Sequence, residues 1–235
     1  ILPGLPVSSL MIAAPVTAAA ILVHRSRGTA GVAALLRRSF DHRRITSRRW
    51  YLPTILLLPL AMLVTYAMMR ALGRPLPDST TIRWRAVPVL LLVFFVGALA
   101  EELGWSGYAL EPLQQRLGAL GASLVLGIAW SVWHFIPLAQ VGRSPSWIAW
   151  WSLYAVASRV LYGWIYNNTG RSVFAVTLFH AMANLSWQLF PNDGSHFDPQ
   201  NAGLVVSAVA LMVIAFWGPR TLTRRSAHSV TSSRS

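Results

Sequence analysis

Residues 86–108 read AVPVLLLVFFVGALAEELGWSGY, an apolar run that carries two adjacent carboxylates toward its end. A helix needs about 20 mostly apolar residues to cross the hydrocarbon of a bilayer, so this stretch predicts a transmembrane helix. Comparable apolar runs occur at 3–23, 50–72, 121–138, 146–166, 172–190 and 201–218. We therefore expect an all-α fold, a polytopic membrane bundle of about seven transmembrane helices.

The composition agrees with a membrane protein and excludes several classes of soluble protein. Of the 235 residues, 54% are hydrophobic and 11% are charged, whereas soluble domains carry roughly 25% charged residues. All 20 basic residues are arginine, and most lie in short segments between apolar runs, a pattern typical of contact with a lipid bilayer and not with nucleic acid. The absence of cysteine excludes a disulfide framework and thiolate catalysis.

The arginines are divided unevenly between alternate loops. Segments 24–49, 109–120, 167–171 and the tail after residue 218 fall on one side and hold most of them, whereas the opposite loops hold four, which are Arg74, Arg83, Arg85 and Arg143. The positive-inside rule predicts that the rich side, with the C-terminus, is cytoplasmic, in what we expect to be a bacterial plasma membrane.

Two segments near the N-terminus allow alternative interpretations. Residues 5–23 have no basic stretch before the apolar run, which favours a first membrane helix over a cleaved signal peptide. Segment 24–49 is either a short amphipathic helix around residues 32–36 that lies on an anionic leaflet, or a solvated loop.

Ionisable residues at membrane depth are expensive and mark functional sites. Those well inside the predicted spans are Glu101, Glu102, His134, Arg159 and His180, with Asn184 as an uncharged polar companion. His180 and Asn184 are four residues apart, as are Trp130 and His134, so each pair shares one helix face. The rise of about 1.5 Å per residue allows all of these groups to meet in one inner-to-middle layer of the membrane.

Each of these groups alone also has a purely structural explanation. A single histidine in a membrane helix is more often a packing residue than a catalyst, and a single asparagine more often joins two helices. Two adjacent carboxylates are harder to explain in this way, because burying one unpaired carboxylate costs several kcal/mol. Together the groups favour a functional site in which one glutamate faces the reaction and the other binds a neighbour.

A carboxylate, two imidazoles and a carboxamide can activate a water molecule and stabilise an oxyanion, as peptide hydrolysis requires. The same groups could ligate a divalent metal such as zinc at Glu101, His134 and His180, although activation of water by a carboxylate requires none. The chain contains neither a G-x-S-x-G nucleophile elbow nor an H-E-x-x-H zinc signature. Water is therefore the expected nucleophile.

The same residues resemble three motifs of the CAAX protease and bacteriocin-processing (CPBP) family of intramembrane proteases, which is related to the CAAX prenyl endopeptidase of eukaryotes. Glu101 to Ser106 resembles the motif E-E-x-x-x-R, Trp130 and His134 resemble an aromatic residue followed four positions later by histidine, and His180 with Asn184 matches H-x-x-x-N. Ser106 departs from the motif, which has arginine at this position.

The resemblance implies an intramembrane endopeptidase that acts on a membrane-associated peptide or protein. Glu101 would activate the water and Glu102 would assist it, while His134, His180 and Asn184 would complete the site and bind the oxyanion. It also implies a catalytic core at 86–190, between N-terminal transmembrane helices at 1–85 and a last transmembrane helix with a basic tail at 191–235.

Ser106 cannot supply the positive charge of the motif arginine. We expect Arg159 either to pair with Glu102 in its place or to extend to the membrane interface. The departure also keeps open a catalytically silent immunity or scaffold protein. A third alternative is a small proton-coupled transporter that uses Glu101 and Glu102, which uptake driven by a pH gradient would reveal.

Overall fold

The structure is a computed structural model that describes residues 7–77 and 82–224. Residues 3–6 of the first predicted span and the tail from residue 225 onward lie outside the described residues. The described residues form helices and no β-strand. The predicted all-α class is therefore confirmed.

Each predicted span overlaps a helix of 16 residues or more, but the bounds of the first span (3–23) and of the fourth (121–138) differ clearly from those of α1 and α4. These long helices of the described chain are α1 (Ala14–Arg37), α2 (Tyr51–Ala71), α3 (Val87–Gly104), α4 (Leu110–Trp133), α6 (Pro145–Asn168), α7 (Val173–Gln188) and α8 (Pro199–Trp217). A short helix α5 (Phe135–Gln140) follows α4, a π-helical turn (Trp105–Ala109) joins α3 to α4, and 3-10 turns cover Val7–Ala13, Arg38–Arg44, Arg48–Trp50 and Trp84–Ala86.

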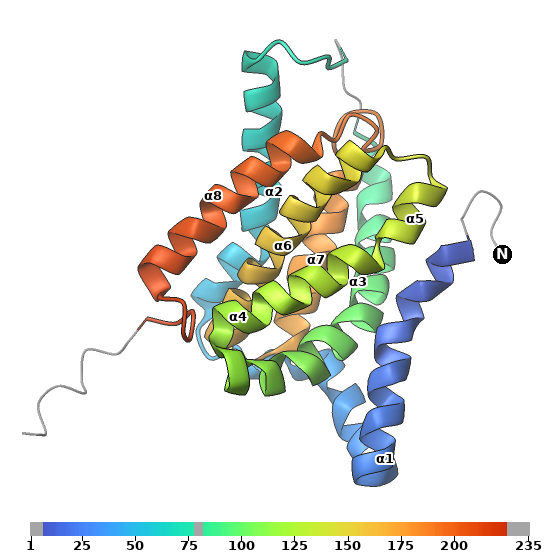
Figure 1. Ribbon diagram of the computed structural model, residues 1–235, viewed down its shortest axis with the longest axis vertical. Helices are drawn as coiled ribbons and strands as arrows, with labels where there is room; N and C mark the ends of the chain where they lie inside the picture. The colour runs from blue at the N-terminus through green and yellow to red at the C-terminus, as the bar shows by residue number, and fades with distance from the viewer. Residues whose placement is uncertain (1–6, 78–81, 225–235) are drawn as a thin grey trace, which may run out of the picture.

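Within the described residues, three helical stretches are long and apolar enough to cross a membrane by themselves: Arg48–Ala71, Trp84–Gln140 and Pro199–Trp217. Seven crossings therefore remain a prediction. Helix α7, with 16 residues, is shorter than the roughly 20 residues that one crossing needs, and α6 and α7 carry Arg159, His180 and Asn184. Figure 1 shows α7 near the middle of the bundle, where it packs against α2, α3 and α6, and protein neighbours surround His180, which is buried.

Two glycines turn the chain inside helical segments. Gly28 (φ 62°, ψ −164°) interrupts α1 and Gly118 (φ 71°, ψ 173°) interrupts α4, in a backbone region that residues with a Cβ rarely adopt. After Gly28 the chain is helical again to Arg37. Within 24–49 we thus find a short helix and not a loop, and its position on a leaflet stays a prediction.

The four arginine-rich segments meet at one end of the bundle, here called the basic end. The guanidinium of Arg38 donates to the carbonyl oxygens of Gly107 (2.7 Å) and Arg171 (2.8 Å), and the N–H of Leu120 donates to the carbonyl of Pro219 (2.9 Å). These contacts join 24–49 to the π-helical turn and the α6–α7 loop, and the start of α4 to the C-terminal segment. The grouping agrees with the predicted common side of the membrane, while its cytoplasmic location stays a prediction.

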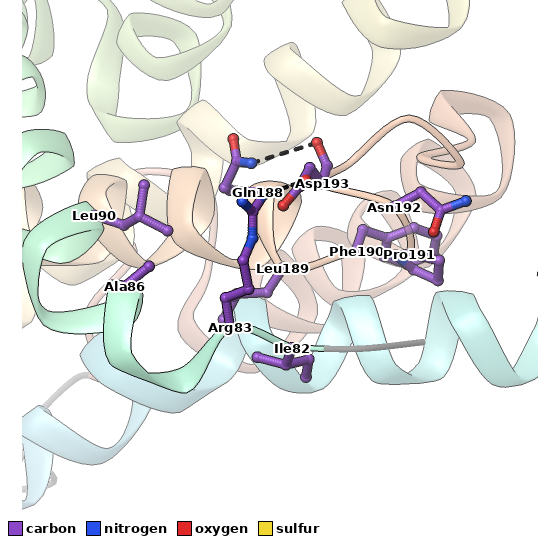
Figure 2. Close-up of a pocket in the computed structure, with 10 residues that line it drawn as sticks. All are labelled: Ile82, Arg83, Ala86, Leu90, Gln188, Leu189, Phe190, Pro191, Asn192 and Asp193. Carbon is purple, nitrogen blue, oxygen red and sulfur yellow. Dashed lines mark hydrogen bonds and ion pairs between the residues drawn. The ribbon is translucent and has the colours of Figure 1, made fainter. Parts of the chain in front are cut away.

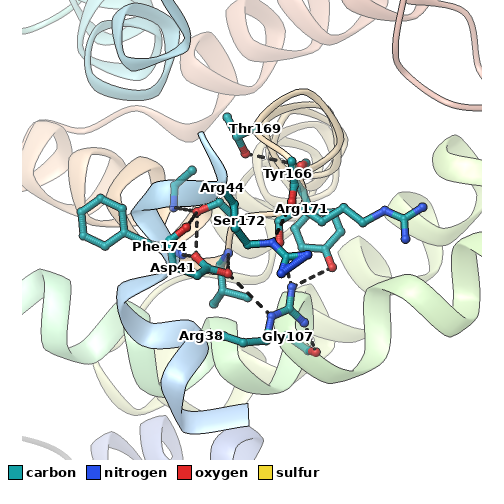
Figure 3. A network of polar contacts seen from close by, with 12 residues as sticks. Arg38, Asp41, Arg44, Gly107, Tyr166, Thr169, Arg171, Ser172 and Phe174 are labelled. Carbon is teal, nitrogen blue, oxygen red and sulfur yellow. Dashed lines mark hydrogen bonds and ion pairs between the residues drawn. The ribbon is translucent and has the colours of Figure 1, made fainter. Parts of the chain in front are cut away.

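Asp41 fixes the start of α7 at this basic end (Figure 3). Its carboxylate accepts hydrogen bonds from the backbone N–H groups of Val173 (3.2 Å) and Phe174 (3.0 Å) and from the hydroxyl of Ser172 (2.8 Å). The first N–H groups of a helix have no partner within the helix, and the helix dipole favours a negative charge there. The N-terminal part of the chain therefore positions α7, the helix that carries His180.

Candidate active site

Glu102 is the centre of a buried polar cluster between α3, α6 and α7. Its side chain is 0% exposed, and Arg159 Nη1 lies 2.9 Å from Oε1 and 3.0 Å from Oε2. His180 Nδ1 lies 3.0 Å from Oε1, and the Ser106 hydroxyl donates to Oε2. Both oxygens of the carboxylate are therefore engaged, and the negative charge of Glu102 has a buried cation beside it.

Of the two positions expected for Arg159, the structure shows the pair with Glu102. Its residue surface is 3% exposed, so its side chain does not extend to the membrane interface. Ser106, in the π-helical turn, is four residues after Glu102 and contacts the same carboxylate. Ser106, at the position where the motif has arginine, thus contacts Glu102, and the positive charge beside this carboxylate comes from Arg159 on α6.

Aromatic rings enclose the guanidinium of Arg159. Its central carbon lies 4.4 Å from the ring centroid of Trp130, 4.8 Å from that of Tyr162 and 6.0 Å from that of Trp105. The face of an aromatic ring attracts a cation, and more strongly when water is excluded. These rings therefore help to stabilise the buried positive charge of Arg159 on α6.

Glu101 has a different environment from its neighbour. It is 7% exposed, and the indole N–H of Trp130 donates to its Oε2 at 2.7 Å. Among the described residues, no hydrogen bond reaches its Oε1. One glutamate is thus held by a cation, and the other is oriented by a single neutral donor and keeps an oxygen free.

Trp130 connects Glu101 to both histidines. Its ring centroid lies 4.8 Å from that of His134 and 5.5 Å from that of His180, and its carbonyl oxygen lies 2.7 Å from His134 Nδ1. The prediction that Trp130 and His134 share one helix face therefore did not include the contact of Trp130 with a carboxylate.

His134 does not lie inside one continuous helix, as the predicted span 121–138 implied. It is the half-buried residue between the end of α4 at Trp133 and the start of α5 at Phe135. Pro137, which lacks an N–H, occupies the first turn of α5, where a helix tolerates proline. Here the proline accompanies the start of a new helix.

The hydrogen-bond partners of the two histidines determine their tautomers. A carboxylate and a backbone carbonyl only accept hydrogen bonds, so Nδ1 of both His180 and His134 carries the proton. When either ring is neutral, its Nε2 is therefore an acceptor. Asn184 is half-buried on α7, one turn after His180, and within the described part of the chain no hydrogen bond joins it to the cluster.

The residues present do not fit a three-ligand metal site. In residues 7–77 and 82–224, no three His, Asp or Glu side chains are grouped so that they could hold a metal ion. Glu102 binds Arg159, His180 and Ser106, and Glu101 binds Trp130. Glu101, His134 and His180, which the sequence suggested as one possible set of metal ligands, are not among the described residues grouped in this way.

Sequence reasoning missed two aromatic residues of the site. Trp151, at the start of a predicted span, is typical of an interfacial belt, yet it is buried with its ring centroid 4.9 Å from that of His134. Tyr162 packs on both Arg159 and His180, the latter at 5.4 Å between centroids. The spacing of Arg159 and Tyr162, three residues on one helix, was the available signal.

A separate cavity of about 190 Å³ lies at the other end of α7, between residues 82–90 and 188–193 (Figure 2). Arg83 and Asp193 form an exposed ion pair there, and the hydrogen bond from Arg83 lowers the pKa of the Asp193 carboxyl. None of the predicted site residues lines this cavity. It therefore adds nothing to the buried cluster.

Comparison with known proteins shows a similarity over part of the chain. Residues 83–186 match the family model described as type II CAAX prenyl endopeptidase Rce1-like. The predicted resemblance is confirmed. This Rce1-like segment contains Glu101, Glu102, Trp130, His134, Arg159, His180 and Asn184, whereas Asp41, which caps α7, lies outside it.

Part of the chain is also similar to a curated protein. Over 112 residues, 44% of this chain, the sequence is 37% identical to CAAX prenyl protease 2 of Methanococcus maripaludis. The match spans 41% of that relative's length. The Rce1-like segment and the apolar helices together indicate an integral membrane protein.

Proposed function

We propose that this protein is an intramembrane endopeptidase that hydrolyses a peptide bond of a membrane-associated peptide or protein, with Glu101 as the base that activates water. The observation that carries the proposal is the difference between the two adjacent glutamates. Glu102 is neutralised by Arg159 and fully hydrogen-bonded, so it is poorly suited to take a proton. Glu101 keeps a free oxygen beside the two histidines.

In the proposed reaction, Glu101 takes a proton from water while the water oxygen attacks the carbonyl carbon of the peptide. The electron pair of the C=O π bond moves onto the carbonyl oxygen. As this tetrahedral intermediate collapses, the C–N bond breaks and the proton passes to the leaving amine. His134, at hydrogen-bond distance from the Trp130 backbone, can assist these proton transfers through Nε2.

His180 and Glu102 form a carboxylate and imidazole pair. A carboxylate that accepts from Nδ1–H fixes the orientation of the ring and stabilises the imidazolium form. Because Arg159 and Ser106 hold Glu102, the orientation of His180 depends on the whole cluster. His180 Nε2 can then accept a proton during the reaction and return it.

The substrate class follows from the location of the site and not from the name of a relative. Buried groups between membrane helices can act on a peptide that reaches the bilayer, and the half-buried His134 and Asn184 are the expected side of approach. A shared site does not determine the substrate. A prenylated CAAX protein is thus one member of the proposed class.

A peptide-cleavage assay on the purified protein in detergent, with and without chelator, tests this function. Glu101→Gln keeps the shape of the side chain and removes its basicity, so turnover should fall by about 10²-fold or more. Glu111→Gln is the matched control, because Glu111 is a partly exposed carboxylate that pairs with Arg171. Hydrolysis by Glu101→Gln within a few-fold of wild type contradicts the assignment.

The silent scaffold and the proton-coupled transporter have less support. The scaffold alternative depended on the charge missing at Ser106, and Arg159 provides that charge to Glu102. The transporter alternative used both glutamates as proton sites, and a fully paired Glu102 is a poor one. Uptake driven by a pH gradient in liposomes, without peptide hydrolysis, would favour the transporter.

A further inference from the structure

A cavity of about 500 Å³ lies at the basic end of the molecule, and none of the candidate active-site residues lines it. Its walls come from three segments that are far apart in the sequence: residues 47–53 at the start of α2, residues 164–168 at the end of α6, and residues 217–224 from the end of α8 onward. Figure 1 shows the start of α2 and the end of α8 at the same end of the bundle. The proposed peptide hydrolysis gives this cavity no role.

Three tryptophans form a row of packed rings along the cavity. The ring centroid of Trp164 lies 5.0 Å from that of Trp50, just before α2, and 5.2 Å from that of Trp217, the last residue of α8. Both pairs pack edge to face, with Trp164 buried and the two outer rings half-buried. Tryptophan is enriched where the headgroups of a bilayer meet its hydrocarbon, because the ring has an apolar body and a polar N–H. We therefore expect the cavity to lie at headgroup level.

Two arginines line the cavity beside these rings and have no carboxylate partner among the described residues. The central carbon of the Arg224 guanidinium lies 4.8 Å from the ring centroid of Trp217, and Arg49 Nε donates to the Ser47 hydroxyl at 2.9 Å.

The acidic residues that the structure describes are all engaged elsewhere. Two cap helices, two pair with other arginines and two belong to the candidate active site, and they are Asp41, Asp198, Glu111, Asp193, Glu101 and Glu102. Within the described part of the chain, the protein therefore does not balance the positive charge of the cavity, and an anion from outside can do so.

The segment that carries Arg224 is held in place by α6. Asn168 Nδ2 donates to the carbonyl oxygens of Leu222 (2.7 Å) and Trp164 (2.8 Å), and Leu222 is buried. Arg224 therefore follows an anchored stretch of chain. Because both N–H groups of Asn168 Nδ2 are used, Oδ1 of this lining residue remains as an acceptor.

The surroundings of the cavity are apolar. Leu52 and Leu56, on the first turns of α2, and Phe216 near the end of α8 are exposed. Phe216 also lines an adjoining hollow of about 660 Å³, which shares Trp217 and Arg224 with the first cavity. A soluble anion would contact the arginines and leave these apolar side chains uncovered. An amphipathic molecule with an anionic end fits both features.

We propose that this cavity binds the headgroup of an anionic phospholipid from the leaflet at the basic end. The guanidiniums of Arg49 and Arg224 donate to the phosphate oxygens, a role that suits the forked donors of arginine. Asn168 Oδ1 accepts from a headgroup hydroxyl, and the acyl chains lie along the exposed apolar side chains of α2 and α8. The lipid thus joins these two helices to α6, the helix that carries Arg159. This binding does not depend on the proposed peptidase function.

Binding of phosphatidylglycerol to the purified full-length protein in detergent, measured by native mass spectrometry, tests the site. Phosphatidylcholine with the same acyl chains is the comparison, because its headgroup has no net charge. Phosphatidylglycerol should bind about 10-fold more tightly or better, since two arginines face a net negative charge. Equal affinity for the two lipids overturns the inference. Displacement of phosphatidylglycerol by inorganic phosphate, with the ionic strength held constant by NaCl, indicates a site for soluble phosphate and also overturns it.

Arg49→Gln with Arg224→Gln removes both donors from exposed positions of the cavity. The affinity for phosphatidylglycerol should fall about 10-fold or more, and the lipid should no longer raise the temperature of unfolding. Arg48→Gln with Arg116→Gln is the matched control, because these arginines are exposed at the same basic end and do not line the cavity. Its affinity should stay within about twofold of wild type. Similar losses in the two double variants indicate a general attraction to surface charge and overturn the inference.

A photoreactive phosphatidylglycerol locates the lipid on the wild-type protein, without any variant. After illumination, the cross-links should lie in proteolytic fragments that contain residues 47–56 and 216–224. Excess unlabelled phosphatidylglycerol should remove these cross-links, and phosphatidylcholine should not. Cross-links spread evenly over the helices, or confined to the opposite end of the bundle, overturn the inference.

Discussion

At the scale of single residues, we expect both the stability of the protein and the activity of the site to depend on the buried pair of Arg159 and Glu102. Both groups are fully or almost fully removed from solvent, and removing one partner of such a pair typically costs about 3–5 kcal/mol because the other charge is left uncompensated. We therefore expect Arg159→Ala to lose stability and activity together, measured by thermal unfolding in detergent and by peptide cleavage.

The position of Ser106 allows a rescue of that variant. Its hydroxyl already contacts Glu102, so Ser106→Arg places a guanidinium near the same carboxylate from the π-helical turn. The double variant should recover a good part of the stability lost in Arg159→Ala and some of the activity. Wild-type behaviour of Arg159→Ala, or no recovery in the double variant, would show that Glu102 needs no cation.

We expect His134 to contribute to activity alone and His180 to contribute to both activity and stability. His134→Ala removes a ring bound only to a backbone carbonyl, so activity should fall by about 10²-fold while the protein still accumulates in the membrane. His180→Ala also removes a partner of Glu102, so its loss of activity should come with lower stability. His196→Ala, outside the cluster, is the control. Failure of His134→Ala to insert would favour a packing role instead.

At the scale of helices, two aspartates offer a matched pair of caps. Asp41 caps α7 from outside, and Asp198 caps its own helix, α8, by accepting from the N–H groups of Gln200 (2.9 Å) and Asn201 (3.4 Å). Replacing either by alanine should cost about 1 kcal/mol, the usual value of a cap. Only Asp41→Ala should also lower the cleavage rate, because α7 carries His180. Equal cleavage rates in the two variants would show that the cap of α7 by Asp41 does not affect the site.

The packing of α4 on α6 depends on Gly127. A Cβ at this position would lie 2.9 Å from Val156 Cα and 3.3 Å from Arg159 Cβ, so the two helices would have to move apart. Gly127→Ala should therefore destabilise the protein by about 1–3 kcal/mol and lower activity, since Trp130 is on the same helix. Gly97→Ala is the control, because its Cβ would meet only the tip of Ile12 at 2.9 Å, which can move away.

At the scale of the whole molecule, the basic end has a predicted side of the membrane. The chain lacks cysteine, so single cysteines can be placed freely. Phe40, at the basic end, and Trp84, before α3, are 69% and 70% exposed, whereas Leu35 is buried and unsuited to labelling. An impermeant reagent applied outside intact cells should label position 84 and not position 40. Labelling of position 40 and not of position 84 would contradict the predicted topology and indicate that the C-terminus is outside.

The helical class of the protein could be predicted from its sequence because each apolar run satisfies its own backbone hydrogen bonds in a helix, whatever its neighbours are. Candidate site residues could also be chosen from the sequence. An ionisable side chain within a bilayer costs free energy, so Glu101, Glu102 and His180 were expected to serve a function. The three motifs then indicated a resemblance, and residues 83–186 do match the type II CAAX prenyl endopeptidase Rce1-like model.

Only the tertiary structure decided how these groups are paired. Sequence spacing shows which residues share a face of one helix but not how two helices are rotated toward each other. For this reason Arg159 could be assigned either to Glu102 or to the membrane interface, and the contact of Trp130 with Glu101 was not foreseen. The cap of α7 by Asp41 joins residues more than 130 positions apart, and the physical reason is the same: such contacts arise when helices pack, after each helix has already been determined by its own residues.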